Sequence, residues 1–376
     1  INIYIVCNYF FRMDGGDGED GEIDEIVETE KEISEEKAVA EVLKMFAPGT
    51  SLRTALDDLL RARMGALILL ENENTSEVIE KGFAINSKFS AQKLVELAKM
   101  DGAIILSNDA KKILHANTLL VPSAGISTKE TGTRHKAAER AAKQTGAIVV
   151  AVSERKNKIT LYYKDMKHVM EESSEILRRA SETLQVLEKQ REMFNDLIYN
   201  LNILEINNLV TINDVSEVFQ RIEIIRRISD IVKRYLIELG KEGMIVSMRL
   251  KELTRNLSRD EEMILKDYFG SEYKRMSDML EKMNFDFLLE SSNISRMLFE
   301  ELHDKSISPR GIRIIGKTNI LEKYLDSLVL HFGTLDKILS LGKEELSSIF
   351  GSEDLAQHFI EKIDMLKEKI MLGKKI

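Results

Sequence analysis

The 376-residue sequence contains no tryptophan, three prolines and a single cysteine, Cys7. One cysteine excludes an internal disulfide framework and is typical of proteins kept in a reducing compartment. No stretch reaches the length of about 18 consecutive apolar residues that a membrane-spanning helix requires. We therefore expect a cytoplasmic protein without a membrane partner.

The first 36 residues differ in composition from the rest. The opening INIYIVCNYFF is mostly apolar but lacks the basic start and the small-residue cleavage site of a signal peptide. Since the chain begins with Ile, we expect its natural start at Met13. Residues 14–36 hold twelve acidic side chains and one lysine, a local charge of −11 against −9 for the whole chain, which leaves the remainder near +2. We expect residues 1–36 to be an acidic, disordered lead-in.

Residues 37–165 alternate between helix-like and strand-like patterns. ALDDLLRAR and SAQKLVELAKM, the latter with Ser90 as its N-cap, predict amphipathic helices. Apolar runs predict strands at GALILL (65–70), DGAIILS (101–107), AIVVAVS (147–153) and KITLYYK (158–164). Short apolar strands interleaved with helices favour a mixed sheet covered by helices, hence an α/β domain.

The rest of the chain has a helical pattern. From Val169 apolar residues recur every three or four positions through Leu204, and a second series ends at Gly240, a residue that commonly stops helices. We predict an all-α spine over residues 166–303. The Pro- and Gly-containing SISPRGIRIIGKTN then opens a small helical unit over residues 304–376, with the pattern of a helix-hairpin-helix-like domain.

The helix expected near Thr133 begins with an unusual charge pattern. GTRHKAAER places Arg134, His135 and Lys136 in its first turn, although cations are favoured at the opposite end of a helix. An anionic ligand would account for them, because a helix N-terminus offers free backbone N–H groups and the positive end of the dipole. Gly132 permits close approach to the backbone and Thr133 adds a hydroxyl. The alternative is a basic helix start that is simply solvated.

A carboxylate stands at the start of the strand predicted in MDGAIILS. Asp101 precedes Gly102 there, and a carboxylate beside phosphates commonly binds a metal ion or accepts a proton from a hydroxyl group. Alone, an Asp-Gly pair is an ordinary turn. The occurrence of both motifs within one α/β domain makes a phosphate-binding site a stronger interpretation than either motif alone would.

Together the segments resemble the diadenylate cyclase family, which condenses two ATP molecules into the bacterial second messenger cyclic di-AMP and two pyrophosphates. KMDGAIILS, ANTLLVP, ETGTRH, AERAAKQTG, AVSERKN and ITLYYK occur in the order found in that family. VTINDVSEVFQRIEIIRRI and YLIELGKEG resemble the helical spine of its DNA-scanning members, in which SPRGIRII falls at the start of a helix-hairpin-helix domain. The resemblance covers roughly residues 40–340.

The resemblance implies roles for particular residues. Asp101 would orient or deprotonate the ribose 3′-hydroxyl and hold a divalent cation, Mg²⁺ or Mn²⁺, while Arg134 and His135 would also be catalytic. The ATP-binding residues would be Gly102, Leu120, Thr133, Arg134, His135, Lys136, Ala137 and Ser153. Two positions depart from the family pattern. Lys136 replaces an arginine and loses its planar fork, and Ala137 stands where close relatives carry a threonine.

The chemistry implies an oligomer. Each chain has one Asp-Gly-Ala and one GTRHK segment, whereas the product is built two-fold symmetrically from two ATP molecules. Two chains facing each other with C2 symmetry would supply both halves. The resemblance further implies a homo-octamer and a cyclase restrained by branched DNA at the C-terminal domain, as part of a response to DNA damage and its repair.

The DNA-binding function rests on the resemblance and is not favoured by charge. Residues 301–376 contain twelve basic and twelve acidic side chains, so no net positive field attracts DNA. The hairpin region around Gly351 reads Gly-Ser-Glu-Asp, where a Gly-hydrophobic-Gly turn is typical. A helical module that serves packing or a protein contact explains this unit equally well.

Two alternative functions remain open at this point. One is a DNA-junction-binding or scaffold protein with a weakened cyclase, suggested by Lys136. The other is a P-loop NTPase that uses Lys317, because Gly311–Thr318 matches G-x-x-x-x-G-K-[ST]. A P-loop requires a buried strand before its first glycine, and DKSISPR precedes it here.

Overall fold

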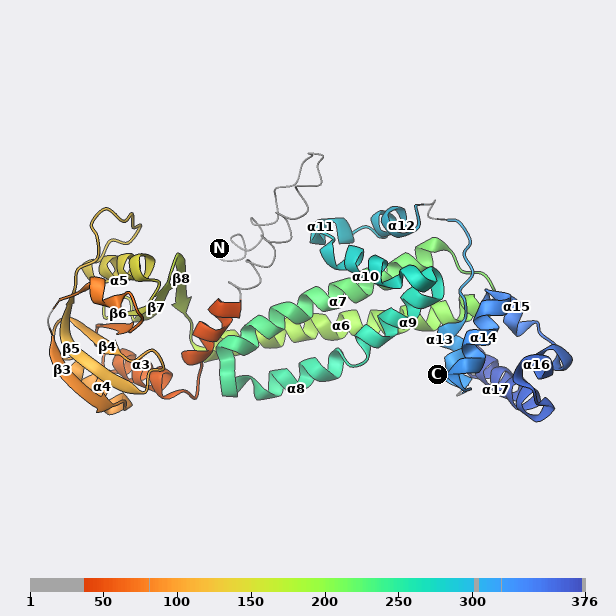
Figure 1. The fold of residues 1–376 in the computed structure, drawn as a ribbon, viewed down its shortest axis with the longest axis horizontal. Helices are drawn as coiled ribbons and strands as arrows, with labels where there is room; N and C mark the ends of the chain where they lie inside the picture. Colours follow the sequence, from red (N-terminus) through yellow and green to blue (C-terminus); the bar gives the residue numbers. More distant parts are fainter. Residues whose placement is uncertain (1–36, 81, 301–303, 319, 374–376) are drawn as a thin grey trace. The chain divides into compact units, whose positions relative to one another are not determined.

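The computed structural model describes residues 37–80, 82–300, 304–318 and 320–373 (Figure 1). The expected acidic lead-in, with Cys7 and Met13, lies outside these ranges. The described residues pack as two compact units. One contains the described residues up to Ser181 together with Lys233–Met248, and the other contains Glu182–Val232 and the described residues from Arg249 onward.

The first unit is built on one mixed sheet of eight strands, which confirms the predicted α/β domain. Seven strands follow the order β2-β5-β4-β1-β6-β7-β8, and β3 pairs with another part of β5. Of the strand pairs within the described residues, β1 with β4 is the parallel one, and the others are antiparallel. The strands are β1 (Ala66–Leu70), β2 (Ile79–Glu80), β3 (Phe83–Lys88), β4 (Ala103–Leu106), β5 (Lys112–Leu120), β6 (Ile148–Ser153), β7 (Lys158–Tyr163) and β8 (Met166–Met170).

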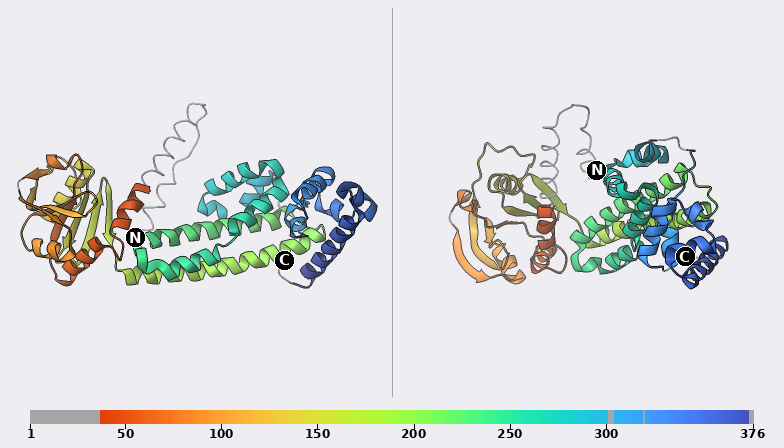
Figure 2. Two further views of the ribbon diagram at one scale, coloured as in Figure 1. Left: turned by 60° about the horizontal axis from the view of Figure 1, so that its bottom comes forward. Right: turned by 45° about the vertical axis from the view of Figure 1, so that its right-hand side comes forward.

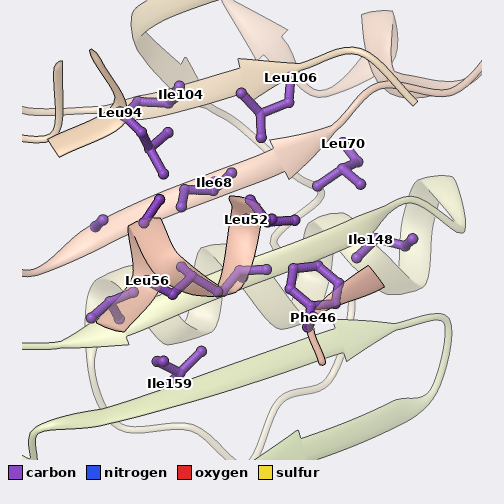
Figure 3. Close-up of a cluster of buried hydrophobic side chains, with 14 of the residues drawn as sticks. Phe46, Leu52, Leu56, Ile68, Leu70, Leu94, Ile104, Leu106, Ile148 and Ile159 are labelled. Carbon is purple, nitrogen blue, oxygen red and sulfur yellow. The ribbon is translucent and has the colours of Figure 1, made fainter. Parts of the chain in front are cut away.

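Helices cover both faces of this sheet. Helices α3 (Ser51–Arg61) and α4 (Ala91–Leu97) lie on one face and α5 (Thr133–Thr145) on the other (Figure 1). Strand β1 is buried along its whole length, with Ile68 and Leu70 facing α3 and α4 (Figure 3) and Leu67 and Leu69 facing α5. Each buried aliphatic side chain contributes about 1.5–3 kcal/mol. Ser90 caps α4 as predicted, since its hydroxyl accepts the Lys93 N–H.

The sheet extends further along the chain than predicted. Strand β8 pairs with β7 through Met170, beyond residue 165, where we placed the end of the domain. Val169, the first residue of the expected helical series, therefore lies in β8 opposite Thr160, and the helix begins at Ser173. The spacing of apolar residues was compatible with a helix here, but the edge of β7 satisfies the backbone hydrogen bonds of this segment as a strand.

The predicted helical spine is present. It starts with α6 (Ser173–Ile206) and α7 (Ile212–Leu239), two long helices that run side by side (Figure 2), and α7 ends directly before Gly240, as expected. Most residues of the two apolar series are buried: Ile176, Ala180, Leu184, Leu187, Phe194, Leu201, Val218, Ile222, Ile225, Val232 and Leu239. Five shorter helices follow: α8 (Met244–Leu253), α9 (Leu257–Phe269), α10 (Tyr273–Lys282), α11 (Phe285–Leu288) and α12 (Ser291–Phe299).

The C-terminal segment is helical, with a core of its own. Its helices are α13 (Ile312–Ile315), α14 (Glu322–Phe332), α15 (Leu335–Leu339), α16 (Lys343–Phe350) and α17 (Glu353–Met371). Leu328, Phe350 and Phe359 are among the side chains that form its core. Helices α14 and α16 both end at a glycine with positive φ, Gly333 and Gly351, which allows two tight helix–turn–helix connections. No helix among the described residues is long and apolar enough to cross a bilayer.

The P-loop alternative is wrong. Gly311–Thr318 forms the short helix α13 and a 3-10 turn, and the residues before it are irregular apart from one isolated bridge at Ser306. Arg313 is buried and forms an ion pair with Glu205 of α6. Within the described residues 304–310 no strand leads into the segment, and Arg313, Ile314 and Ile315 in its interior are buried.

Candidate active site

One edge of the sheet gathers the predicted site. Strands β1 and β4 are parallel and start at this edge, while β6 and β5 run antiparallel to them and end there. The register pairs Ala66 with Val152 and Ala103 with Thr118. The segments that precede β1 and β4 therefore lie beside those that follow β6 and β5.

Asp101 and Gly102 stand at this edge, directly before β4. Gly102 has φ +92°, and a Cβ atom there would lie 2.9 Å from the backbone oxygen of Thr118. Only glycine fits both the left-handed conformation and this close contact with β5. The Asp101 side chain is exposed, and no hydrogen bond or ion pair among the described residues engages its carboxylate. It is free to meet a ligand.

The start of α5 presents free backbone donors. Gly132 is the N-cap in an extended conformation, with no side-chain cap, and the first intrahelical bond runs from the Lys136 N–H to the Gly132 carbonyl. The N–H groups of Thr133, Arg134 and His135 consequently have no helical partner. The first turn contains no acidic residue. This is the geometry of an anion site, as the sequence predicted.

Arg134 packs over a glycine, Gly65, that the sequence did not identify as a site residue. A Cβ atom on Gly65 would lie 2.1 Å from a guanidinium nitrogen of Arg134, so the arginine packs over this glycine just before β1. Extending the β1–β6 register by one residue puts Gly65 beside Ser153. The fold thus brings Arg134 and Ser153 to the same edge as the Asp101-Gly102 turn. Nothing in the local sequence around Gly65 signals this role.

The remaining predicted residues are placed as follows. The Ser153 hydroxyl accepts the Lys156 N–H at 3.2 Å and keeps its own proton available for donation. Leu120 ends β5, but its side chain is buried in the core under α5, so it can line the site only with its backbone. Ala137 packs against the same core and lies inside the helical ladder. Lys136 is half-buried in the first turn of α5.

His135 lies in a strongly charged environment. Burial lowers its pKa below the usual value, and the positive charges of Arg134, Lys156 and Lys167 lower it further, against the opposing effect of Glu130. The imidazole is therefore mainly neutral before an anion arrives. A bound phosphate would reverse this balance and favour the protonated, hydrogen-bond-donating form.

The C-terminal hairpin differs from the cyclase edge in its charge. Gly351 has φ +70° and open space around its Cβ position, and the Ser352 hydroxyl caps α17 by accepting the Leu355 N–H. Glu353 and Asp354 occupy the first turn of α17. Two carboxylates at this helix start oppose the approach of a DNA phosphate.

The residues at the sheet edge fit a metal ion that arrives with its nucleotide. Among the described residues no group of three or more His, Cys, Asp or Glu side chains is arranged to hold a metal. Mg²⁺ commonly binds through one or two carboxylates, water molecules and substrate phosphates. The free Asp101 carboxylate suits such a partial ligand set and does not suit an all-protein metal cage.

Known proteins match these parts of the chain. The sequence model described as DisA bacterial checkpoint controller nucleotide-binding (DAC) matches residues 53–167, and the one described as DisA bacterial checkpoint controller linker region matches residues 170–303. The DNA integrity scanning protein DisA of Clostridioides difficile is 42% identical over 89% of this chain and 96% of its own length. The chain belongs to the DisA family.

A second DisA relative supports the same assignment. DisA of Clostridium acetobutylicum is 41% identical over 92% of this chain and 99% of its own length. A solved structure of DacA from Staphylococcus aureus is 30% identical, covers 34% of this chain and 86% of its own, and superposes with a TM-score of 0.28, too low to add weight. The resemblance to the diadenylate cyclase family is confirmed, and the DAC match identifies the α/β domain as a diadenylate cyclase domain.

Proposed function

We propose that this DisA family member condenses two ATP molecules into cyclic di-AMP and two pyrophosphates at the edge of its sheet. One observation supports the proposal most strongly. The fold brings the exposed Asp101 carboxylate to the same edge of the sheet as the start of α5, whose first N–H groups have no helical partner. The helix start suits a triphosphate, and the carboxylate suits the hydroxyl that attacks it.

Binding would depend on the start of α5. The free N–H groups and the Thr133 hydroxyl would donate to phosphate oxygens, and Arg134 would add a planar pair of donors. Gly132 and Gly102 keep the backbone accessible, because neither carries a side chain that would stand between it and the nucleotide. These donors are already in place, so they stabilise the charge that develops on the phosphorus without reorganisation.

Catalysis would be mainly positioning. Asp101 would accept the proton of a ribose 3′-hydroxyl or orient that hydroxyl toward the α-phosphorus of the other ATP. A divalent cation, Mg²⁺ or Mn²⁺, would neutralise phosphate charge when bound and share Asp101 as a ligand. His135 would gain a proton beside the phosphates and stabilise the departing pyrophosphate.

The reaction would take place between two chains. Each chain supplies one Asp101 and one α5 start, and both phosphodiester bonds of the ring need such a set. A C2 pair of cyclase domains satisfies this requirement, and we propose a homo-octamer as the assembled form.

We propose further that branched DNA bound by the C-terminal domain restrains the cyclase, linking cyclic di-AMP to DNA damage and repair. The helical unit with two glycine-ended turns supports a helix-hairpin-helix-like domain. Its test is the rate of cyclic di-AMP formation with and without a four-way DNA junction, with linear duplex of the same length as the control. Inhibition by the junction alone is the expected result, and equal rates in all samples would contradict the coupling.

The cyclase proposal is tested by the products. Purified protein is incubated with ATP and either Mg²⁺ or Mn²⁺, and nucleotides are resolved by mass-detected chromatography. We expect cyclic di-AMP with two pyrophosphates released for each product molecule, and none after chelation of the metal. Formation of ADP and phosphate without any cyclic product would contradict the proposal and indicate an ATPase.

A further inference from the structure

A buried tyrosine links the phosphate-binding helix to the sheet. Tyr162 of β7 is 1% exposed and lies in the core under α5. Its hydroxyl donates to the Glu130 carboxylate at 2.9 Å, and Glu130 belongs to the loop that leads into α5. Lys167 of β8, which is paired with Tyr162 across the two strands, forms an ion pair with the same carboxylate. We call Glu130, Tyr162 and Lys167 the loop anchor.

The loop anchor contacts His135 directly. The His135 ring meets the Tyr162 ring edge-on, with centroids 6.5 Å apart and an interplanar angle of 78°. Glu130 is the negative charge that acts on His135, while Arg134, Lys156 and Lys167 are the positive ones. The ring of Tyr162 therefore supports the position of the imidazole, and the carboxylate that it holds balances the surrounding cations.

The protonation states of the anchor are fixed around neutral pH. Burial raises the pKa of Tyr162 far above its usual value, so the phenol remains a donor. Burial also acts to raise the pKa of Glu130, but hydrogen bonds from Lys167 and Tyr162 outweigh it and lower that pKa, so the carboxylate remains an acceptor. The same hydrogen bond therefore persists over the pH range in which the enzyme is assayed.

The loop itself is fastened to α5 by further contacts. The Glu130 N–H donates to the Thr128 hydroxyl at 3.1 Å, and that hydroxyl donates in turn to the Glu139 carboxylate on α5. Arg140 donates from Nε to the carbonyl of Ile126 at 2.9 Å. These contacts join the loop to its own helix, whereas Glu130 joins both of them to strands β7 and β8.

We infer that Glu130, Tyr162 and Lys167 are positioning residues of the cyclase, which hold the loop and His135 in the phosphate-binding arrangement before ATP binds. The inference rests on the proposed function, since it assigns the supports of that same site. Ordering the loop in advance removes an entropy cost that ATP binding would otherwise have to overcome.

The test compares variants that remove one group at a time. Tyr162→Phe removes only the hydroxyl, Glu130→Gln removes only the charge, and Lys167→Met removes the cation that Lys167→Arg retains. We expect kcat/KM for ATP to fall about ten-fold in the first three, with Lys167→Arg close to wild type. The double variant Tyr162→Phe/Glu130→Gln should be no worse than the poorer single variant, because both break one unit.

The matched control is Tyr163→Phe. Tyr163 is the neighbouring strand residue, and it packs against the core on the opposite face of the sheet. We expect this variant to retain wild-type kinetics. Unchanged kcat and KM in Tyr162→Phe and Glu130→Gln, measured well below their melting temperatures, would overturn the inference and leave the anchor a purely structural contact.

A binding measurement separates this inference from the proposed function. The dissociation constant for ATP is measured by titration calorimetry for wild type, Tyr162→Phe and Tyr163→Phe. If wild type makes no cyclic di-AMP but Tyr162→Phe alone binds ATP about ten-fold more weakly, the proposed reaction fails and the anchor stands. Equal affinities in all three proteins, or no ATP binding by wild type, would overturn the anchor.

Discussion

At the scale of single residues, the site depends as much on missing side chains as on reactive ones. Asp101, Gly102, Arg134 and His135 were proposed as site residues from the sequence because they lie in motifs with a definite chemistry. Gly65 was not, since its role is to leave space for an arginine about 70 positions further along the chain. Such long-range steric requirements leave no local pattern in a sequence.

We predict that Gly65→Ala lowers cyclase activity without unfolding the protein. Its Cβ would displace the guanidinium group of Arg134, which is the far end of a flexible side chain and can move at little cost in stability. We expect kcat/KM for ATP to fall at least about ten-fold, with the melting temperature nearly unchanged. The control is Gly316→Ala, where a Cβ meets no atom within 4 Å. Wild-type activity in Gly65→Ala would show that the packing of Arg134 over Gly65 does not matter for cyclase activity.

At the scale of secondary-structure elements, the helical region combines an apolar core with a few buried charged residues. The period of the apolar residues identified α6 and α7 correctly. In a long amphipathic helix, each turn adds an apolar residue to the buried face, so the pattern repeats many times. The same pattern placed Val169 in a helix although it lies in β8. A short edge strand has too few residues to distinguish the period of 2 of a strand from the period of 3.6 of a helix. Buried ion pairs were also unpredictable, since a charged residue is usually solvated and its spacing does not reveal its partner.

One such cluster makes stability depend on pH. Glu223 and Glu261 share Arg226, and burial raises the pKa of Glu261 from 4.5 to about 7. The unfolded chain releases this proton near pH 4.5, whereas the folded chain keeps it until about pH 7. The contribution of Glu261 to the free energy of unfolding, on the order of 1–3 kcal/mol, should therefore be lost as pH rises through this window and stay level above it.

We predict that Glu261→Gln flattens this dependence. Glutamine cannot ionise, so the variant should lose less stability than wild type between pH 5 and pH 8, as measured by urea denaturation at several pH values. The exposed Glu252→Gln is the control and should follow wild type. Parallel curves for wild type and Glu261→Gln would mean that Glu261 is not the titrating group.

We predict that Gly311–Thr318, the segment that matches the P-loop pattern, stabilises the fold through Arg313. Arg313 is buried against Glu205, so Arg313→Ala leaves a buried carboxylate without its partner and should lower the free energy of unfolding by about 3–5 kcal/mol. Lys317→Ala removes an exposed side chain and should cost within about 0.5 kcal/mol. Denaturation of both variants checks this. A larger loss in Lys317→Ala than in Arg313→Ala would refute the assignment.

At the scale of the whole molecule, one chain holds half of the groups that the proposed reaction needs. Asp101 and the α5 start occur once per chain, while a two-fold symmetric product requires them twice. The number of copies in the assembly cannot be read from these residues, because they define which groups must meet and not how larger rings are built. DNA binding was not predictable from charge either, since the C-terminal residues 301–376 carry equal numbers of basic and acidic side chains.

We predict that inactive chains lower the activity of the wild-type chains with which they assemble. After dissociation and reassembly with a nine-fold excess of Asp101→Asn chains, the cyclic di-AMP rate per wild-type chain should fall to about one tenth, since most wild-type chains then face an inactive partner. Chains carrying Lys317→Ala serve as the mixing control. An unchanged rate per wild-type chain would indicate that each chain works alone.

The most direct test of the account is the rate at which Asp101→Asn forms cyclic di-AMP from ATP, compared with wild type and Lys317→Ala by mass-detected chromatography. The substitution keeps the size of an exposed side chain and removes its charge, so folding should be unaffected. We predict a loss of at least about 100-fold in Asp101→Asn and a near-normal rate in Lys317→Ala. Full activity in Asp101→Asn, or loss of activity in Lys317→Ala alone, would contradict a cyclase centred on the sheet edge.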